Sequence, residues 1–280
     1  MSLHASISSY SADIDGLHLH WLEAGRADQG PAVLLLHGWP TSSFLWRNIL
    51  PGMADGNRVI ALDLPGFGHS DKPLNQTYNF EFYRRTIDSF LAAQGIRKLG
   101  LAVHDLGGPV GLYWAIHNPD RVEKLALLNT LVYPNPSWAV LAFVLAARTP
   151  VLNGYLVSRR GLKGAMKLGV DNRQVITDEV MEGVAQPFTS RAAQKALLKT
   201  ARELNMGGFY RIAKALPDFD MPVRVIYGEN DRILPDVAKT MARVKQDLPQ
   251  AEVTSLPECG HFLQEEEPDW IAAELAAFFA

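Results

Sequence analysis

Short apolar runs that alternate with helical patterns restrict the fold of this 280-residue chain more than any other feature. Four runs in the first half are nearly continuous in apolar residues: Val33 to His37, Val59 to Asp63, Leu99 to Val103 and Leu125 to Asn129. Strands buried on both faces of a parallel sheet have this composition, and parallel strands need helical crossovers. Helical patterns fill the gaps over residues 44–53, 81–94 and 108–117. The alternation predicts an α/β fold with a mostly parallel central sheet and helices on both faces.

An antiparallel hairpin is expected ahead of these strands. The segments from Ile7 to Asp13 and from Leu17 to Glu23 both have strand composition, and Asp15-Gly16 lies between them. An Asp-Gly pair is a strong signal for the tight turn of a hairpin, because both residues accept a positive φ.

The alternation stops over residues 131–217, where only helical patterns occur. The expected helices of this segment cover residues 138–148, 178–186, 191–205 and 208–216. Alternation then resumes with strands from Val223 to Tyr227 and Glu252 to Leu256, and with helices over 236–246 and 268–279. We therefore expect a core of residues 1–130 and 218–280, with a helical cap of residues 131–217 inserted before the last two strands. Such a cap would cover the carboxyl ends of the strands, where open α/β sheets bind ligands.

Composition excludes several classes of partner. A net charge of −3 leaves no basic excess to neutralise phosphates, so no nucleic-acid partner is expected. The longest apolar run, Trp138 to Ala147, is far shorter than the roughly 20 residues of a spanning helix, so no membrane partner is expected. The single cysteine, Cys259, allows no intrachain disulfide, and the N-terminus has no signal pattern. Both observations favour a cytoplasmic protein.

Four short loops that each follow an expected strand carry the candidate chemistry. They are His37-Gly38-Trp39-Pro40, His104-Asp105-Leu106-Gly107-Gly108, Gly228-Glu229-Asn230-Asp231 and Gly260-His261. Because the carboxyl ends of parallel strands share one edge of the sheet, these loops should meet. The chain order of nucleophile, acid and histidine is that of α/β-hydrolases.

Asp105 is the candidate nucleophile. Gly107 and Gly108 allow a strand to turn directly into a helix, which pushes Asp105 out over the sheet edge at a helix N-terminus. An aspartate is already ionised at neutral pH and can attack an electrophilic carbon to form an ester. Val103 stands where the usual pattern has glycine. The alternative interpretation is that Asp105 only caps the following helix.

His261 is the candidate base, and Asp231 is the acid expected to orient it. His261 would take a proton from water, and the hydroxide would attack the ester on Asp105. Asp231 would fix the ring tautomer and stabilise its cation, although it could instead cap the next helix. The backbone N–H groups of Trp39 and Leu106 are expected to form the oxyanion hole.

Three segments give the chain a close resemblance to the epoxide hydrolase and haloalkane dehalogenase branch of the α/β-hydrolases. They are residues 37–48, residues 63–73, which read Asp-Leu-Pro-Gly-Phe-Gly-His-Ser-Asp-Lys-Pro, and residues 104–108. The resemblance covers nearly the whole chain and is weakest in the cap. It implies the α/β-hydrolase fold, an ester intermediate on Asp105, a small apolar substrate with water as co-substrate, and neither cofactor nor metal.

Residues at the leaving-group positions favour an epoxide over a haloalkane. Dehalogenases of this branch typically offer paired N–H donors to the halide. Here Leu106, which has no side-chain donor, and Trp39 occupy two of those positions. Trp138 is the remaining candidate for a halide donor from the cap. Epoxide hydrolases use cap tyrosines, and the segment Gly207 to Arg211 resembles their tyrosine segment. It makes Tyr210 a candidate, with Tyr133 or Tyr155 as a second. We expect an epoxide hydrolase; the alternatives are a haloalkane dehalogenase with an atypical halide site and a non-catalytic binding protein of this fold.

Overall fold

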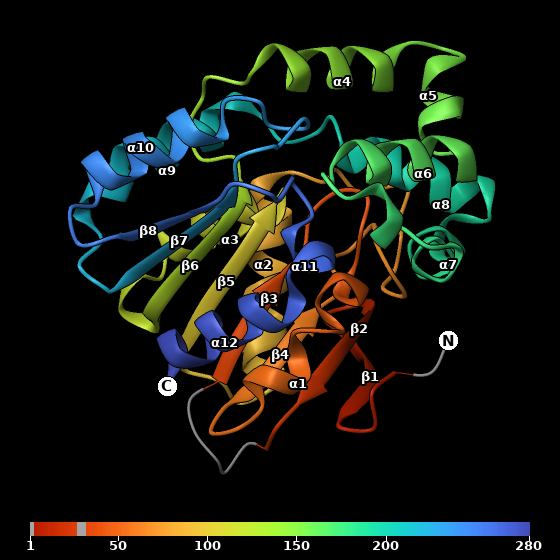
Figure 1. The fold of residues 1–280 in the computed structure, drawn as a ribbon. Helices are drawn as coiled ribbons and strands as arrows, with labels where there is room; N and C mark the ends of the chain where they lie inside the picture. The colour runs from red at the N-terminus through yellow and green to blue at the C-terminus, as the bar shows by residue number, and fades with distance from the viewer. Residues whose placement is uncertain (1–2, 27–31) are drawn as a thin grey trace.

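A single eight-stranded sheet organises the part of the chain that the computed structural model describes, residues 3–26 and 32–280 (Figure 1). The strands are β1 (Ile7–Ile14), β2 (Leu17–Ala24), β3 (Ala32–Leu36), β4 (Arg58–Leu62), β5 (Leu99–Asp105), β6 (Val122–Thr130), β7 (Val223–Gly228) and β8 (Glu252–Leu256). Their order across the sheet is β1-β2-β4-β3-β5-β6-β7-β8. β2 pairs antiparallel with β1 and β4, and every pair from β4 to β8 is parallel. The expected mostly parallel α/β fold is confirmed.

The N-terminal hairpin forms with the expected turn. Ile14 pairs with Leu17, and the two residues between them, Asp15 and Gly16, have φ values of 51° and 76°. Positive φ at both central residues is what a tight hairpin turn requires. This antiparallel hairpin closes one edge of the sheet.

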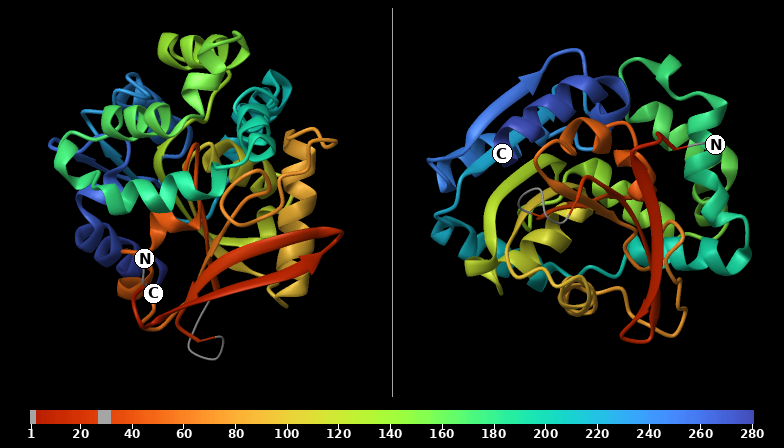
Figure 2. Two further views of the ribbon diagram at one scale, coloured as in Figure 1. Left: turned by 90° about the vertical axis from the view of Figure 1, so that its right-hand side faces the viewer. Right: turned by 90° about the horizontal axis from the view of Figure 1, so that it is seen from below.

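Helices cover both faces of the sheet (Figures 1 and 2). On one face α2 (Phe80–Ala93) packs against α3 (Gly107–Ala115), and on the other α1 (Leu50–Met53) packs against α12 (Pro268–Phe279), which follows α11 (Leu263–Glu266). α10 (Val237–Asp247) contacts β7 and β8. The central strands β3, β4 and β5 are almost fully buried, and all seven residues of β5 are buried. Burial on both faces explains why the sequence of these strands is apolar throughout rather than alternating.

The helix expected over residues 44–53 is wrong as a single element. The segment forms a 3-10 helix, η1 (Ser43–Trp46), followed by the one-turn α1, which has Pro51 in its first turn. Proline has no N–H to donate to the preceding turn, so a continuous helix through this position would be broken. Ser42 caps η1 by accepting the N–H of Phe44.

Helices and turns occupy the whole segment between β6 and β7, and the structure describes every residue there. They are α4 (Trp138–Arg148), α5 (Leu152–Leu156), α6 (Arg159–Leu168), α7 (Asp178–Ala185), α8 (Arg191–Thr200) and α9 (Met206–Ala215), with short 3-10 turns between them. Figure 1 shows α4, α5 and α6 beyond the carboxyl ends of β5 and β6. The helices therefore lie where the expected cap places them, while the division into core and cap stays a prediction.

Two of these helices, α5 and α6, are absent from the sequence expectations. α6 contains Gly161 and Gly164 and four cations, and it buries only Gly161, Leu162 and Met166. Glycine weakens a helical pattern, and so few buried positions leave only a short apolar stripe to detect. Among the described residues, no helix is long and apolar enough to cross a bilayer.

Candidate active site

Asp105 lies at the sharp turn between β5 and α3, with a φ of 50°. This left-handed conformation is uncommon for residues other than glycine and has to be held by its surroundings. The hydroxyl of Thr130 donates to the backbone carbonyl of Asp105 at 2.6 Å. A Cβ on Gly108 would overlap the same hydroxyl, so glycine is needed there for α3 to start so close to β6. The turn thus fixes Asp105 at the carboxyl edge of the sheet, as expected.

The carboxylate of Asp105 is buried, with 7% exposed, and both of its oxygens face donors. The backbone N–H of Trp39 donates to Oδ1 at 2.7 Å, and Nε2 of His261 lies 3.3 Å from Oδ2. Burial alone would raise the pKa of Asp105, but the contact with His261 and the charge of its ring outweigh burial and hold the pKa below its ordinary value. Asp105 is therefore ionised at neutral pH.

His261 is fully buried and bridges the two carboxylates. Its Nδ1 donates to Oδ2 of Asp231 at 2.7 Å, which leaves Nε2 directed at Asp105. Burial alone would lower the pKa of His261, but the negative charge of Asp231 and the contact with Asp105 outweigh it and raise the pKa to about 10. His261 is therefore an imidazolium at neutral pH, as long as both carboxylates beside it are charged.

Asp231 is held on both oxygens. Its Oδ1 accepts the N–H groups of Ile233 at 2.8 Å and Leu234 at 2.7 Å, so it caps the following turn while its Oδ2 accepts from His261. The same carboxylate therefore makes both of the expected contacts: one oxygen caps the following turn, and the other accepts from His261.

Asn129 is the residue of this cluster to which the sequence assigned no role. It lies at the end of β6 with a φ of 31°. Its Nδ2 donates to Oδ2 of Asp231 at 2.7 Å, and its Oδ1 accepts the N–H of Gly228 at 2.9 Å. Its amide therefore ties the end of β6 to the loop that carries Asp231. A signal existed in the sequence, because Asn129 lies at the carboxyl end of a parallel strand, at the same sheet edge as the candidate loops.

Two further histidines fix the backbone around the cluster. Nδ1 of His37 donates to the carbonyl of Gly38 at 3.0 Å, and its Nε2 accepts the N–H of Leu64 at 3.1 Å. His104 donates from Nε2 to the carbonyl of His261 at 2.9 Å. Burial lowers the pKa of both rings, that of His104 to about 3, so both are neutral and act as positioning groups.

Gly38 lets the Trp39 N–H approach Asp105, and this close approach gives a testable prediction. A Cβ at position 38 would overlap the Asp105 carboxylate. Gly38→Ala should therefore displace the nucleophile and lower kcat by about 100-fold, because small misplacements of reacting groups cost that much. Gly154→Ala is the matched control, since a Cβ at that position in α5 meets nothing within 4 Å. Steady-state kinetics on both variants checks this, and equal activity would rule out the close-approach argument.

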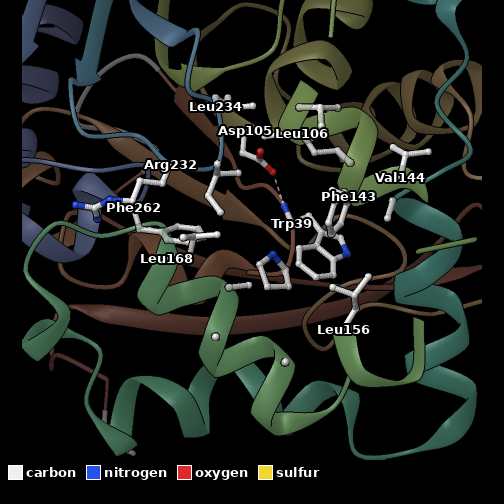
Figure 3. Close-up of a pocket in the computed structure, with 18 of the residues that line it drawn as sticks. Trp39, Asp105, Leu106, Phe143, Val144, Leu156, Leu168, Arg232, Leu234 and Phe262 are labelled. Atoms are coloured by element: carbon white, nitrogen blue, oxygen red, sulfur yellow. Dashed lines mark hydrogen bonds between the residues drawn. The ribbon is translucent and has the colours of Figure 1, made fainter. Parts of the chain in front are cut away.

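A cavity of about 390 Å³ opens above Asp105, and its lining is mainly apolar (Figure 3). Residues of the expected core on its wall include Trp39, Asp105, Leu106, Leu234 and Phe262. Cap residues on its wall include Val140, Phe143, Val144, Tyr155, Leu156 and Leu168. Three of the sequence-predicted residues thus meet Asp105 at one cavity: Trp39, Leu106 and Tyr155. Its size and composition suit a small apolar substrate.

The other predicted cap residues lie away from this cavity. Tyr210 is 64% exposed on α9, because Phe209 and Ile212 of the same helix face inward and turn it toward solvent. Tyr133 is buried, but its hydroxyl donates to Asp247 at 2.7 Å. Trp138 is 74% exposed on the outer side of α4. None of these three side chains is on the wall of this cavity, so their expected role in substrate binding stays a prediction.

The described residues that line the cavity include one tryptophan, Trp39, and no asparagine, so the usual pair of halide donors is missing among them. Leu106 has no donor in its side chain, and the indole N–H of Trp39 donates to the backbone carbonyl of Leu197 at 3.3 Å. Arg232 and Tyr155 are the lining side chains that carry N–H or O–H donors, apart from that indole.

Residues 31–268 match the alpha/beta hydrolase fold family. The chain belongs to this family. It is 30% identical to the haloalkane dehalogenase of Mesorhizobium japonicum, covering 93% of this chain and 87% of the relative. It is 28% identical to a cis-3-alkyl-4-alkyloxetan-2-one decarboxylase of Shewanella oneidensis, over 94% of this chain and 86% of the relative.

Solved structures of related proteins also match this chain. The haloalkane dehalogenase DbeA from Bradyrhizobium elkani superposes with a TM-score of 0.86 at 26% identity, covering 98% of this chain and 97% of that one. The epoxide hydrolase CorEH has a TM-score of 0.83 and covers 98% of both chains; at 24% identity it shows the fold alone. The protein is therefore an α/β-fold hydrolase related to the haloalkane dehalogenases.

Proposed function

We propose that this hydrolase opens epoxides to vicinal diols through an ester on Asp105. The observation that carries the proposal is the ionised Asp105 carboxylate at the base of an apolar cavity that offers no paired halide donors. Oδ1 accepts the Trp39 N–H at 2.7 Å, whereas Nε2 of His261 lies farther from Oδ2, at 3.3 Å. Oδ2 is therefore the less tightly held oxygen, and we assign the attack to it.

In the first step, Oδ2 of Asp105 attacks a ring carbon of the epoxide and the C–O bond of the ring breaks. The electron pair of that bond goes to the ring oxygen, which needs a proton or a strong donor as it becomes an alkoxide. Tyr155 carries the cap hydroxyl on the cavity wall and is 59% exposed. We assign it as the proton donor; its phenolate regains a proton from solvent.

Formation of the ester changes the charge around His261 and so prepares the second step. The esterified Asp105 is neutral, and one of the two carboxylates that raise the pKa of His261 is lost. The pKa of His261 then falls, and the ring releases its proton to solvent. The neutral Nε2 can now take a proton from water while the hydroxide attacks the ester carbonyl.

The tetrahedral intermediate places its negative charge where the backbone donors lie. Oδ1, already paired with the Trp39 N–H at 2.7 Å, becomes the oxyanion. The Leu106 N–H also stabilises the Asp105 carboxylate and is the second donor. Collapse of the intermediate expels the alkoxide, which takes the proton from His261 and leaves as the diol. Asp231 stabilises the imidazolium between these transfers.

A haloalkane dehalogenase is the second candidate, because a relative of that name is 30% identical over most of the chain. The attack on carbon would be the same, with halide as the leaving group. The Shewanella relative, by its name, acts on an oxetan-2-one, a strained ring whose leaving group is also oxygen. That relative and the missing paired halide donors together favour an oxygen leaving group here.

The direct test is a panel of aryl and alkyl epoxides, bromoalkanes and a cis-3,4-dialkyloxetan-2-one with the purified protein. Diol formation from epoxides supports the proposal. Bromide release with no diol formation would favour the dehalogenase, and carbon dioxide release from the oxetanone alone would favour a decarboxylase. An absence of diol across the epoxide panel contradicts the proposed function.

Tyr155 gives a second, residue-level prediction. Tyr155→Phe should lower kcat for epoxides by about 100-fold, because the developing alkoxide loses its donor. Tyr210→Phe, which removes the hydroxyl from an exposed tyrosine outside the cavity, should leave kcat unchanged. Single-turnover measurement of ester formation distinguishes a loss in ring opening from a loss in ester hydrolysis. Equal rates of ester formation and equal kcat for the wild type and Tyr155→Phe would show that this tyrosine is not the proton donor.

A further inference from the structure

Helix α4 is apolar on all of its faces, yet it is the least buried helix of comparable length in the cap segment. Of its eleven residues, Trp-Ala-Val-Leu-Ala-Phe-Val-Leu-Ala-Ala-Arg, only Ala147 is buried. Val140, Phe143 and Val144 face the cavity, whereas Trp138, Leu141 and Leu145 face solvent with 74%, 57% and 67% of their surface exposed. Helices that are apolar all round are normally buried in a core or a membrane.

The exposed apolar surface continues beyond α4. Val151, in the turn before α5, is 86% exposed, and Leu152, the first residue of α5, is 50% exposed. We call Trp138, Leu141, Leu145, Val151 and Leu152 the outer cap face. Figures 1 and 2 show α4 and α5 as the outermost part of the molecule at the cap end. A contiguous apolar segment at such a position marks an interaction surface.

The segment of the chain that carries the outer cap face has charges of one sign. Residues 131–170 contain no aspartate or glutamate and five cations: Arg148, Arg159, Arg160, Lys163 and Lys167. With −3 for the whole chain, the segment carries +5 and the remaining residues carry −8. Arg159 pairs with Glu182 and Lys163 with Asp178. Among the described residues, no carboxylate forms an ion pair with Arg148, Arg160 or Lys167, so much of the positive charge is uncompensated.

We propose that the outer cap face binds the surface of an anionic lipid bilayer. Apolar side chains that include a tryptophan, flanked by arginine and lysine, are the composition of interfacial helices. The tryptophan and leucines would enter the boundary between headgroups and acyl chains, while the arginines pair with lipid phosphates. No spanning helix is needed. This proposal departs from the expectation that the protein has no membrane partner, because a net charge of −3 for the whole chain includes a segment of +5.

A second copy of this chain fits the outer cap face less well. Two copies that meet through α4 would place two uncompensated positive segments against each other, which opposes association. An anionic bilayer instead supplies both the apolar layer and the negative charge.

Bilayer docking would also bring the cavity close to the lipid, since one side of α4 lines the cavity and the other forms the outer cap face. This consequence rests on the proposed function: apolar epoxides concentrate in bilayers and could enter without crossing water. The bilayer interaction itself requires no turnover.

Vesicle flotation of the purified protein tests the proposal. With vesicles of equal parts phosphatidylcholine and phosphatidylglycerol, the wild type should float with the lipid, and added salt should weaken binding. Leu141→Gln/Leu145→Gln should lower the partition coefficient about 100-fold, and Arg148→Gln/Arg160→Gln about 30-fold. Two control variants remove equivalent exposed groups elsewhere and should bind like the wild type. They are Leu74→Gln/Val253→Gln for the apolar pair and Lys98→Gln/Lys239→Gln for the charged pair.

The proposal is wrong if the wild type does not float with anionic vesicles, or if the outer-face variants bind as well as the wild type does. It is also wrong if the protein binds no vesicles and sedimentation velocity detects a dimer that the outer-face variants abolish. Asp105→Asn should bind vesicles like the wild type, so a failure of lipid binding and a failure of the proposed catalysis are distinguishable. Melting temperatures close to that of the wild type show that the variants are folded.

Discussion

Asp105→Asn is expected to lower kcat by at least about 10⁴-fold, because the variant lacks the ionised oxygen that attacks the substrate. The fold should survive the change. Asparagine is nearly isosteric with aspartate and tolerates a positive φ better than most residues, so it suits the φ of 50° at this turn. Steady-state kinetics and a thermal melt on the same preparation measure the two effects separately.

Asp55→Asn is the matched control for that experiment. Asp55 is exposed in the turn between α1 and β4, away from the cavity, and its replacement should leave kcat unchanged. If Asp105→Asn kept substantial turnover with the wild-type melting temperature, Asp105 would not be the nucleophile.

His261→Gln should separate the two steps of the reaction. The variant retains Asp105 but has no base to activate water, so the first turnover should proceed and the second step should slow by at least about 1,000-fold. Rapid-quench measurement should show a burst of about one equivalent of consumed substrate followed by very slow turnover.

The pH of that experiment follows from the pKa of Asp105. His261 contributes the contact and charge that hold this pKa down, and burial alone would raise it. In His261→Gln the pKa of Asp105 therefore rises, and a larger fraction of the nucleophile is protonated at acidic pH. The burst should be largest at alkaline pH and should decrease as pH falls. Wild-type steady-state rates in the variant would exclude His261 as the base.

The meeting of Asp105, Asp231 and His261 could be predicted from the sequence because it depends on topology. Each residue follows a strand of the parallel part of the sheet, and the carboxyl ends of β5, β7 and β8 lie at one edge. No detail of side-chain packing is needed for that inference. The catalytic roles of these residues remain predictions, to be tested by the variants above.

The cap could not be predicted to the same depth, for a physical reason. Which side of a helix faces inward is read from an apolar stripe, and α4 has apolar residues on every side. Trp138 was therefore a reasonable pocket candidate, yet it faces solvent. Tyr210 was proposed from a local segment match, but the inward positions of α9 belong to its neighbours Phe209 and Ile212.

Intact-mass spectrometry of His261→Gln would detect the ester on Asp105 itself. After incubation with an epoxide that the wild type hydrolyses, the variant should be heavier by the full mass of that epoxide. Peptide mapping should then locate the ester on Asp105. A variant that stays unmodified with every substrate that the wild type turns over, or an adduct that maps to another residue, would exclude Asp105 as the nucleophile.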